Sequence, residues 1–206
     1  MPIHVYVDID DVLAETTRAL ARLACSHFGK SVKFEDMRVF DLSLSLGLSP
    51  VELETFMRAA HDADFLMQLD PIEGAVETLT DWHSAGAEIS VVTGRPAETR
   101  SITERWLAQE DIPHHRLELV DKYDRYPGRD TKGKEALRDR GYQVVVEDSV
   151  DMAEYLSATG AEVLLFDRPW NGSHACAHPR ITRVHDWNEI RSHVTPRLTP
   201  PAGAPS

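Results

Sequence analysis

The sequence has few of the features that mark exported or membrane-spanning proteins. Its two cysteines, Cys25 and Cys176, lie far apart and form no CxxC pair, which argues against a zinc site and a disulfide framework and favours a reducing cytoplasm. No apolar run approaches the roughly 18 residues that cross a bilayer. The chain also enters a strand pattern at its first residues, without the basic and apolar regions of a signal peptide. We therefore expect a cytoplasmic protein that does not associate with membranes.

Basic residues are scarce relative to acidic ones. Lys and Arg total 22 against 34 for Asp and Glu, so the formal net charge is −12. Such a surface repels phosphodiester polymers, and nucleic-acid polymers are not expected partners. With 206 residues, of which 42% are hydrophobic, the chain is long enough for one domain, or for one domain with an inserted subdomain.

Short apolar runs alternate with segments of helical periodicity over most of the chain. Nearly continuous apolar runs are typical of parallel strands that are buried on both faces, and alternation with helices indicates an α/β fold built on a parallel sheet. The predicted strands are residues 3–7, 88–92, 117–120, 143–146, 162–166 and 181–184. Helices are predicted over residues 97–109, 133–140 and 150–159, the last two followed by a glycine.

One interval departs from this alternation. Residues 14 to about 86 contain no strand pattern but several helical ones, including a capping box with proline at Ser49-Pro50-Val51-Glu52 and a last helix from Glu73 to Ala85. We therefore predict a core domain made of residues 1–14 and 71–194, with a helical insertion at 15–70. Residues 195–206 hold four of the 12 prolines and are predicted to form a disordered tail.

Polar residues follow several of the predicted strands at the point where each ends. Asp8-Ile9-Asp10-Asp11 follows the first strand, Thr93-Gly94-Arg95 the second, and Glu147-Asp148-Ser149 a later one. In parallel α/β sheets these ends meet at one edge, where ligands bind. Carboxylates in such proximity need a cation, and an all-oxygen set favours Mg²⁺. Thr93 and Gly94 offer donors for phosphate oxygens, and Lys132 offers a nearby positive charge.

In their order along the chain these residues resemble the four motifs of the haloacid dehalogenase-like (HAD) hydrolase superfamily. Asp8-Ile9-Asp10-Asp11-Val12 resembles the first motif, Val91-Val92-Thr93-Gly94-Arg95 the second, Lys132 the third and Val146-Glu147-Asp148-Ser149 the fourth. The resemblance implies a three-layer, Rossmann-like core with a helical cap inserted after the first strand. It also implies a phosphatase that depends on Mg²⁺ and acts on a small phosphorylated substrate.

The same resemblance implies a role for each matching residue. Asp8 would be the nucleophile that forms an aspartyl-phosphate and would also bind Mg²⁺, while Asp10 would act as general acid and base and bind the metal through its main-chain carbonyl. Thr93, Gly94 and Lys132 would hold the phosphate. Asp148 would complete the metal site, and Glu147 would orient metal-bound water.

A general acid at Asp10 suits an alkoxide leaving group, which needs a proton, better than a halide, which does not. The segments Asp70–Ala75, Leu165–Asn171 and Arg183–Trp187 are similar to the 5′(3′)-deoxyribonucleotidase-like group, which implies a (deoxy)ribonucleoside 5′-monophosphate as substrate. A phosphatase of a non-nucleotide biosynthetic intermediate, a phosphomutase and a non-enzymatic phospho-acceptor signalling module are the alternatives.

Several residues keep more than one interpretation. Lys134 is the alternative to Lys132 in the third motif, and Lys122 lies upstream of both. Asp11 is expected to cap the helix that follows rather than to react. Arg95 could equally be a solvated residue of the turn after the second motif.

Overall fold

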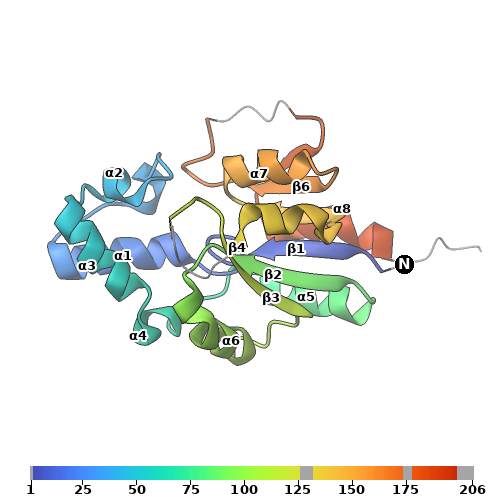
Figure 1. The fold of residues 1–206 in the computed structure, drawn as a ribbon, viewed down its shortest axis with the longest axis horizontal. Coiled ribbons are helices and arrows are strands. Elements are labelled where there is room, and N and C mark those ends of the chain that lie inside the picture. Colours follow the sequence, from blue (N-terminus) through green and yellow to red (C-terminus); the bar gives the residue numbers. More distant parts are fainter. Residues whose placement is uncertain (1, 126–131, 174–177, 199–206) are drawn as a thin grey trace, which may run out of the picture.

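A parallel β-sheet forms the centre of the protein. The computed structural model describes residues 2–125, 132–173 and 178–198, so Cys176 and residues 199–206 of the predicted tail lie outside the described residues. The strands of the sheet are hydrogen-bonded in the order β4-β3-β2-β1-β5-β6-β7, and every pairing is parallel (Figure 1). Their bounds are β1 His4–Asp8, β2 Glu88–Thr93, β3 Arg116–Asp121, β4 Lys132–Gly133, β5 Val144–Glu147, β6 Glu162–Phe166 and β7 Ile181–Val184.

The strands form where the apolar runs predict them. Each predicted run overlaps an observed strand, and β6 and β7 match their runs at both ends. The central strands are buried on both faces, which explains why they read as continuous rather than alternating apolar segments. The two-residue strand β4 was not predicted, because Lys132-Gly133 has no apolar pattern of its own and is extended only through its pairing with β3.

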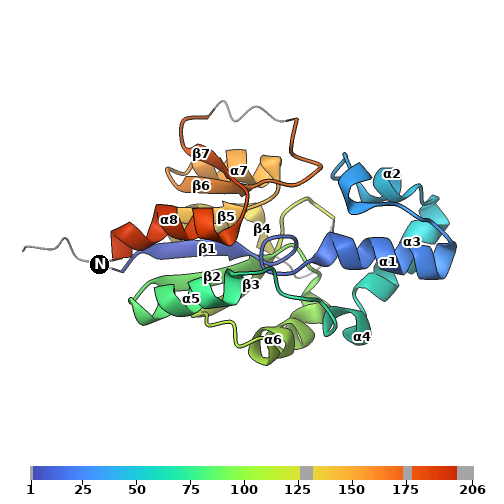
Figure 2. The ribbon, with the colours of Figure 1, turned by 180° about the vertical axis from the view of Figure 1, so that it is seen from behind.

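Helices cover both faces of the sheet and make a three-layer α/β domain. One face packs against α5 (Ala75–Ser84), α6 (Arg100–Gln109) and α8 (Trp187–Leu198), as Figure 2 shows. Each of these helices contributes a buried tryptophan. The other face packs against α7 (Val150–Ser157) and the 3₁₀ segment η3 (Lys134–Arg140). A further 3₁₀ turn, η2 (Ala97–Thr99), leads into α6.

Two local predictions need correction. The segment predicted as a helix over residues 133–140 is a 3₁₀ helix that starts at Lys134. Residues 195–198, assigned to the disordered tail from their prolines, belong to α8, which contains Pro196 and runs to Leu198. Helix α8 tolerates Pro196 because its apolar side is packed: Trp187, Ile190 and Val194 are buried in the main core.

Residues 16–66 form a separate helical lobe beyond the carboxyl ends of the central strands (Figures 1 and 2). Its elements are α1 Thr16–Phe28, η1 Phe34–Asp36, α2 Leu42–Leu46, α3 Pro50–Ala60 and α4 Ala63–Leu66. The predicted capping box is present at the start of α3, where Ser49 and Glu52 exchange both hydrogen bonds.

The helical lobe has its own hydrophobic cluster and joins the sheet domain through two adjacent chain segments. Phe56, Met37 and Leu46 are fully or almost fully buried within this cluster. The outgoing and returning chains are paired, because Glu15 N donates to Asp70 O at 2.9 Å and Ile72 N donates to Leu13 O at 2.8 Å. Over the described residues, no helix has the length and apolar character needed to cross a bilayer.

Candidate active site

The carboxyl ends of four neighbouring strands bring polar side chains to one point. Asp8 is the last residue of β1, Thr93 the last of β2 and Glu147 the last of β5, while Lys122 directly follows β3. Strand order runs outward in both directions from β1, with β2 on one side and β5 on the other. Such a reversal of strand order opens a crevice in parallel α/β sheets, and this is where the side chains meet.

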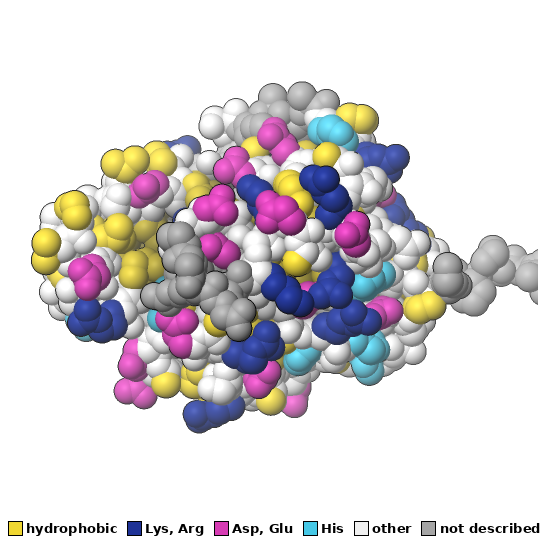
Figure 3. All heavy atoms as spheres, viewed as in Figure 1, with side chains coloured by type: hydrophobic (Ala, Val, Ile, Leu, Met, Phe, Trp, Pro, Cys, Tyr) yellow, Lys and Arg dark blue, Asp and Glu magenta, His cyan; other side chains and the backbone are white. Residues whose placement is uncertain are grey.

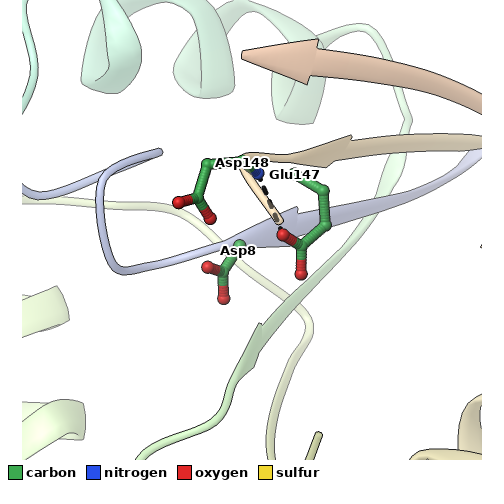
Figure 4. Close-up of side chains that lie close together, drawn as sticks. All are labelled: Asp8, Glu147 and Asp148. Atoms are coloured by element: carbon green, nitrogen blue, oxygen red, sulfur yellow. Dashed lines mark hydrogen bonds between the residues drawn. The ribbon is translucent and has the colours of Figure 1, made fainter. Parts of the chain in front are cut away.

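Three buried acids form the centre of the site. Asp8, Glu147 and Asp148 each offer a carboxylate oxygen within 4.8 Å of the others (Figure 4). Glu147 has both oxygens engaged: Oε1 accepts hydrogen bonds from Tyr6 Oη at 3.0 Å and Lys122 Nζ at 2.7 Å, and Oε2 accepts from the main-chain N–H groups of Asp148 and Ser149, each at 2.9 Å. By contrast, no described residue donates to Asp8 Oδ2 or Asp148 Oδ1.

Burial and mutual repulsion act strongly on these acids. Burial raises the pKa of Asp8 to about 8, and the nearby Glu147 and Asp10 carboxylates add to the rise against the opposing effect of Lys122. Burial, Glu147 and Asp8 also raise the pKa of Asp148 well above its usual value. One ammonium group is therefore not enough to keep both Asp8 and Asp148 ionised, and a further cation would relieve the repulsion.

The lysine beside the acids is Lys122, not the predicted Lys132. Lys122 is 2% exposed, and its Nζ donates to Asp8 Oδ1 and Glu147 Oε1, both at 2.7 Å. Burial acts to lower the pKa of Lys122, but the two carboxylates outweigh it and raise the pKa well above its usual value. Lys132 is exposed on β4, and Lys134 lies beside the Tyr155 ring, with Nζ 5.6 Å from the ring centroid.

Asp10 lies beside the acid cluster, and its carboxylate accepts hydrogen bonds from three side chains. Its Oδ1 accepts from Arg95 Nη2 at 2.7 Å and Thr16 Oγ1 at 2.8 Å, and its Oδ2 accepts from Thr93 Oγ1 at 3.3 Å. Burial acts to raise the pKa of Asp10, but the Arg95 guanidinium and the Thr16 hydroxyl outweigh it and lower the pKa below its usual value. No described residue donates to the main-chain carbonyl of Asp10.

The loop after β1 is fixed by its own backbone. Ile9 O accepts hydrogen bonds from the N–H groups of Val12, Leu13 and Ala14. Asp11 has a φ of 61°, in the left-handed region that asparagine and aspartate tolerate best among non-glycine residues. Its carboxylate accepts from Thr17 N at 3.0 Å and Thr17 Oγ1 at 2.6 Å, so it caps the first turn of α1 as expected. Burial raises the pKa of Asp11 to about 7.

Thr93 and Gly94 face the site from the end of β2. Thr93 is fully buried, and its hydroxyl accepts a hydrogen bond from Arg95 N at 3.1 Å while it donates to Asp10. A Cβ at Gly94 would lie 3.5 Å from the side chains of both Lys122 and Tyr123, so this backbone runs close beside the lysine. Arg95, which could have been solvated, is 4% exposed.

The loop after β6 holds Asp148 in place. Trp170 Nε1 donates to Asp148 Oδ2 at 2.9 Å, and Asn171 Nδ2 donates to the main-chain oxygens of Asp148 and Phe166, both at 2.8 Å. The Asn171 side-chain oxygen in turn accepts from Arg183 Nη1 at 2.7 Å. These contacts orient the carboxylate of Asp148, so that its second oxygen, Oδ1, remains available on the side of Asp8.

A pocket lies between these residues and the helical lobe. The sheet side supplies charged groups, including Asp8, Asp10, Lys122 and Arg125, whereas the lobe supplies an apolar wall. The lobe residues of this wall are Leu20, Met37, Val39, Phe40, Leu42, Met57, Ala60 and Leu66. Figure 3 shows hydrophobic side chains gathered on the lobe, and Phe40 lies 5.2 Å from Tyr123 between ring centroids.

His61, at the end of α3, is the one histidine of the described residues that lines this pocket. Burial lowers its pKa, and the Asp10 carboxylate opposes that effect.

The donor set fits Mg²⁺. Asp8 Oδ2, Asp148 Oδ1 and the main-chain carbonyl oxygen of Asp10 have no hydrogen-bond donor among the described residues, and oxygen atoms without nitrogen or sulfur beside them suit this ion. Glu147, with all its contacts already made, can orient the loop that carries Asp148 without itself being a ligand.

For two residues of the site, Lys122 and Arg95, the sequence did not settle the role. Lys122 was considered, but helix-capping residues before Lys132 favoured that lysine, although the position of Lys122 just after a strand that neighbours β2 was an available signal. For Arg95 the sequence has no such signal, because a turn arginine can point either to solvent or inward.

Known proteins resemble this chain over nearly its whole length. A family model described as "5′ nucleotidase, deoxy (Pyrimidine), cytosolic type C protein" matches residues 1–198. "Putative nucleotidase BH1399" of Halalkalibacterium halodurans is 29% identical over 189 residues, which are 91% of this chain and 90% of that protein. A "Putative nucleotidase" of Bacillus cereus is 23% identical and covers 89% of this chain and 93% of its own.

Solved structures share the fold. A HAD family hydrolase of Deinococcus radiodurans, crystallised with phosphate and sodium, superimposes with a TM-score of 0.66 at 20% identity and covers 98% of this chain and 99% of its own. The predicted HAD-like α/β fold is thereby confirmed.

Proposed function

Since the chain belongs to the family of 5′ nucleotidase, deoxy (pyrimidine), cytosolic type C proteins, we propose that this HAD-type phosphatase hydrolyses (deoxy)ribonucleoside 5′-monophosphates. The observation that carries the proposal is the meeting of Asp8, Asp10, Lys122 and Asp148 at one pocket. The apolar wall with Phe40 and Tyr123 supports a nucleoside as the part of the substrate that does not react. The two distant cysteines, which indicate no disulfide framework, favour a cytoplasmic location.

In the proposed reaction Asp8 is the nucleophile. One oxygen of its carboxylate attacks phosphorus and forms an aspartyl-phosphate while the bond to the ester oxygen breaks, and the other oxygen is left for the metal. Arg95 outweighs burial and lowers the pKa of Asp10, so this carboxylate is ionised before substrate binds, and the negative charge of the bound phosphate favours its protonation. Protonated Asp10 then gives its proton to the leaving alkoxide and later takes one from the water that hydrolyses the aspartyl-phosphate. Thr93, the Gly94 N–H and Lys122 hold the phosphate oxygens.

Asp8, Asp148 and the main-chain carbonyl of Asp10 would hold Mg²⁺. When bound, the ion neutralises charge on the acids and on the phosphate. Lys122 supplies part of the same neutralisation from within the protein, because it remains an ammonium group between Asp8 and Glu147. We assign residues 15–70 as the cap, which shields the reacting groups from bulk water and limits the substrate to small molecules.

The test is phosphate release from a panel of nucleoside monophosphates, sugar phosphates and biosynthetic phosphoesters, with Mg²⁺ present and then chelated. We expect release from nucleoside 5′-monophosphates that stops on chelation and resumes when Mg²⁺ is restored. Preferred turnover of a sugar phosphate would refute the nucleotide substrate. Isomer formation without free phosphate would favour a phosphomutase, and a stable phosphoprotein without turnover would favour a signalling module.

A further inference from the structure

Arg95 forms a buried ion pair with Asp10. The arginine side chain is 3% exposed and approaches the carboxylate with two nitrogens: Nη2 lies 2.7 Å from Oδ1, and Nε lies 3.1 Å from Oδ1 and 3.2 Å from Oδ2. Its remaining nitrogen, Nη1, lies 3.5 Å from Thr103 Oγ1 on α6. This two-pronged contact fixes the plane of the carboxylate as well as its distance.

Asp10 depends on side-chain contacts for its orientation. The backbone of its loop is already fixed by the hydrogen bonds to Ile9 O, so the side-chain torsions decide where the carboxylate points. Thr16 and Thr93 contribute one hydroxyl each, and hydroxyl groups rotate freely about their bonds. Arg95 is the one rigid donor among the described contacts of this carboxylate.

The exposures of the two partners show on which side Arg95 acts. Both residues line the pocket, but the side chain of Asp10 is 28% exposed, whereas that of Arg95 is only 3% exposed and lies behind the carboxylate. The guanidinium therefore supports the carboxylate from the protein side and leaves an edge of it open to a substrate. Stability alone explains this pair poorly, because taking a guanidinium out of water costs several kcal/mol, and apolar residues often replace buried pairs without loss.

We propose that Arg95 is a positioning residue that holds the Asp10 carboxylate in place for proton transfer to the leaving oxygen, and that its effect on turnover passes through Asp10. The inference rests on the proposed function, in which Asp10 is the general acid. It assigns to Arg95 no contact with the substrate or the metal.

The proposal has a consequence for different leaving groups. An alkoxide, such as the 5′-oxygen of a nucleoside, needs a proton as the ester bond breaks, whereas a nitrophenolate leaves without one. Loss of Arg95 should therefore slow nucleoside monophosphates much more than p-nitrophenyl phosphate. A merely structural defect would slow both substrates equally.

The experiment compares Arg95→Met and Arg95→Lys with the wild type on both substrates at saturating Mg²⁺. General acid catalysis contributes about 100-fold or more, so a partial loss of alignment in Arg95→Met should lower kcat for the nucleotide by about 10-fold or more, with KM little changed. For p-nitrophenyl phosphate we expect a change below about 3-fold. Arg95→Lys keeps the positive charge but loses the planar guanidinium that contacts the carboxylate with two nitrogens, so it should recover only part of the nucleotide rate.

Two comparisons isolate the pathway through Asp10. In an Asp10→Asn background, Arg95→Met should have no further effect on nucleotide turnover, since residues that act as a unit are not additive. Arg116→Met is the control for the loss of an arginine from an ion pair away from the site, because Arg116 pairs with Glu88 at 3.1 Å, is half exposed and lies at the start of β3, at the opposite end of the strand from the site. Its kinetics should equal those of the wild type.

Equal losses on both substrates, no loss on either, or faster nucleotide turnover in Arg95→Met would each overturn the role of Arg95. Wild-type protein that turns over neither substrate would instead refute the proposed function. If Arg95→Met does not fold, as judged by its melting curve, the ratio of the two rates in Arg95→Lys decides the question in the same way.

Discussion

Replacing Lys122 with methionine tests both the electrostatics of the site and the identity of its lysine. The substitution keeps a long apolar side chain but removes an ammonium group that lies 2.7 Å from Asp8 Oδ1 and 2.7 Å from Glu147 Oε1. Both carboxylates are at most 5% exposed, so water cannot take the place of the lysine. Removing one partner of a buried pair costs about 3–5 kcal/mol.

That loss is large against the total stability of about 5–15 kcal/mol that is usual for a folded domain. We therefore expect Lys122→Met to lower the urea midpoint strongly at pH 7, and saturating Mg²⁺ to restore part of the loss by neutralising the same acids. Turnover should fall by about 100-fold or more, the scale seen when one donor to a reacting oxygen is removed.

Lys132→Met and Lys134→Met are the matched controls. Both lysines lie away from the acids, so their substitution should change stability by less than about 0.5 kcal/mol and leave turnover near the wild-type rate. Urea titrations and phosphate release, measured on the three variants side by side, give both quantities. Loss of turnover in Lys132→Met or Lys134→Met together with normal turnover in Lys122→Met would refute the placement of the positive charge.

Three further predictions concern the surroundings of the site. Mg²⁺ should raise the melting temperature of the wild type but hardly that of Asp148→Asn, and an equal rise in both would show that Asp148 is not a ligand. Asn171→Ala leaves the buried main-chain oxygens of Asp148 and Phe166 without their donor, so urea unfolding should show a loss of about 1–3 kcal/mol; an unchanged midpoint would contradict this. Because the pKa of Asp11, about 7 in the folded protein, lies above its unfolded value near 4, the folded state binds more protons between these limits, and stability falls as pH rises through them. In chelator, the melting temperature should therefore fall less between pH 5 and 8 for Asp11→Asn than for the wild type, and equal slopes would contradict the assignment.

The sheet and its acidic edge could be predicted from the sequence because both depend on local patterns. Continuous apolar runs mark strands that are buried on both faces, and residues just past those runs must lie at the carboxyl edge of a parallel sheet. Asp8, Thr93 and Asp148 were found in this way, and the structure brings them together. The capping box at Ser49 was equally local.

Features that depend on tertiary contacts could not be predicted. Strand β4 exists through its pairing with β3, and α8 extends over Pro196 because its apolar side packs on the core. The choice between Lys122 and Lys132 depends on which of them reaches the interior, which spacing along the chain does not determine. The inward turn of Arg95 is a matter of side-chain direction, and only its ion pair with Asp10 reveals it.

The central claim is that Asp8 carries out the hydrolysis of nucleoside 5′-monophosphates. Its most direct test is Mg²⁺-dependent phosphate release from these substrates by the wild type and by Asp8→Asn under identical conditions, with melting curves to confirm that both are folded. We predict steady release by the wild type and only background release by Asp8→Asn. Comparable release by the two proteins would contradict the claim.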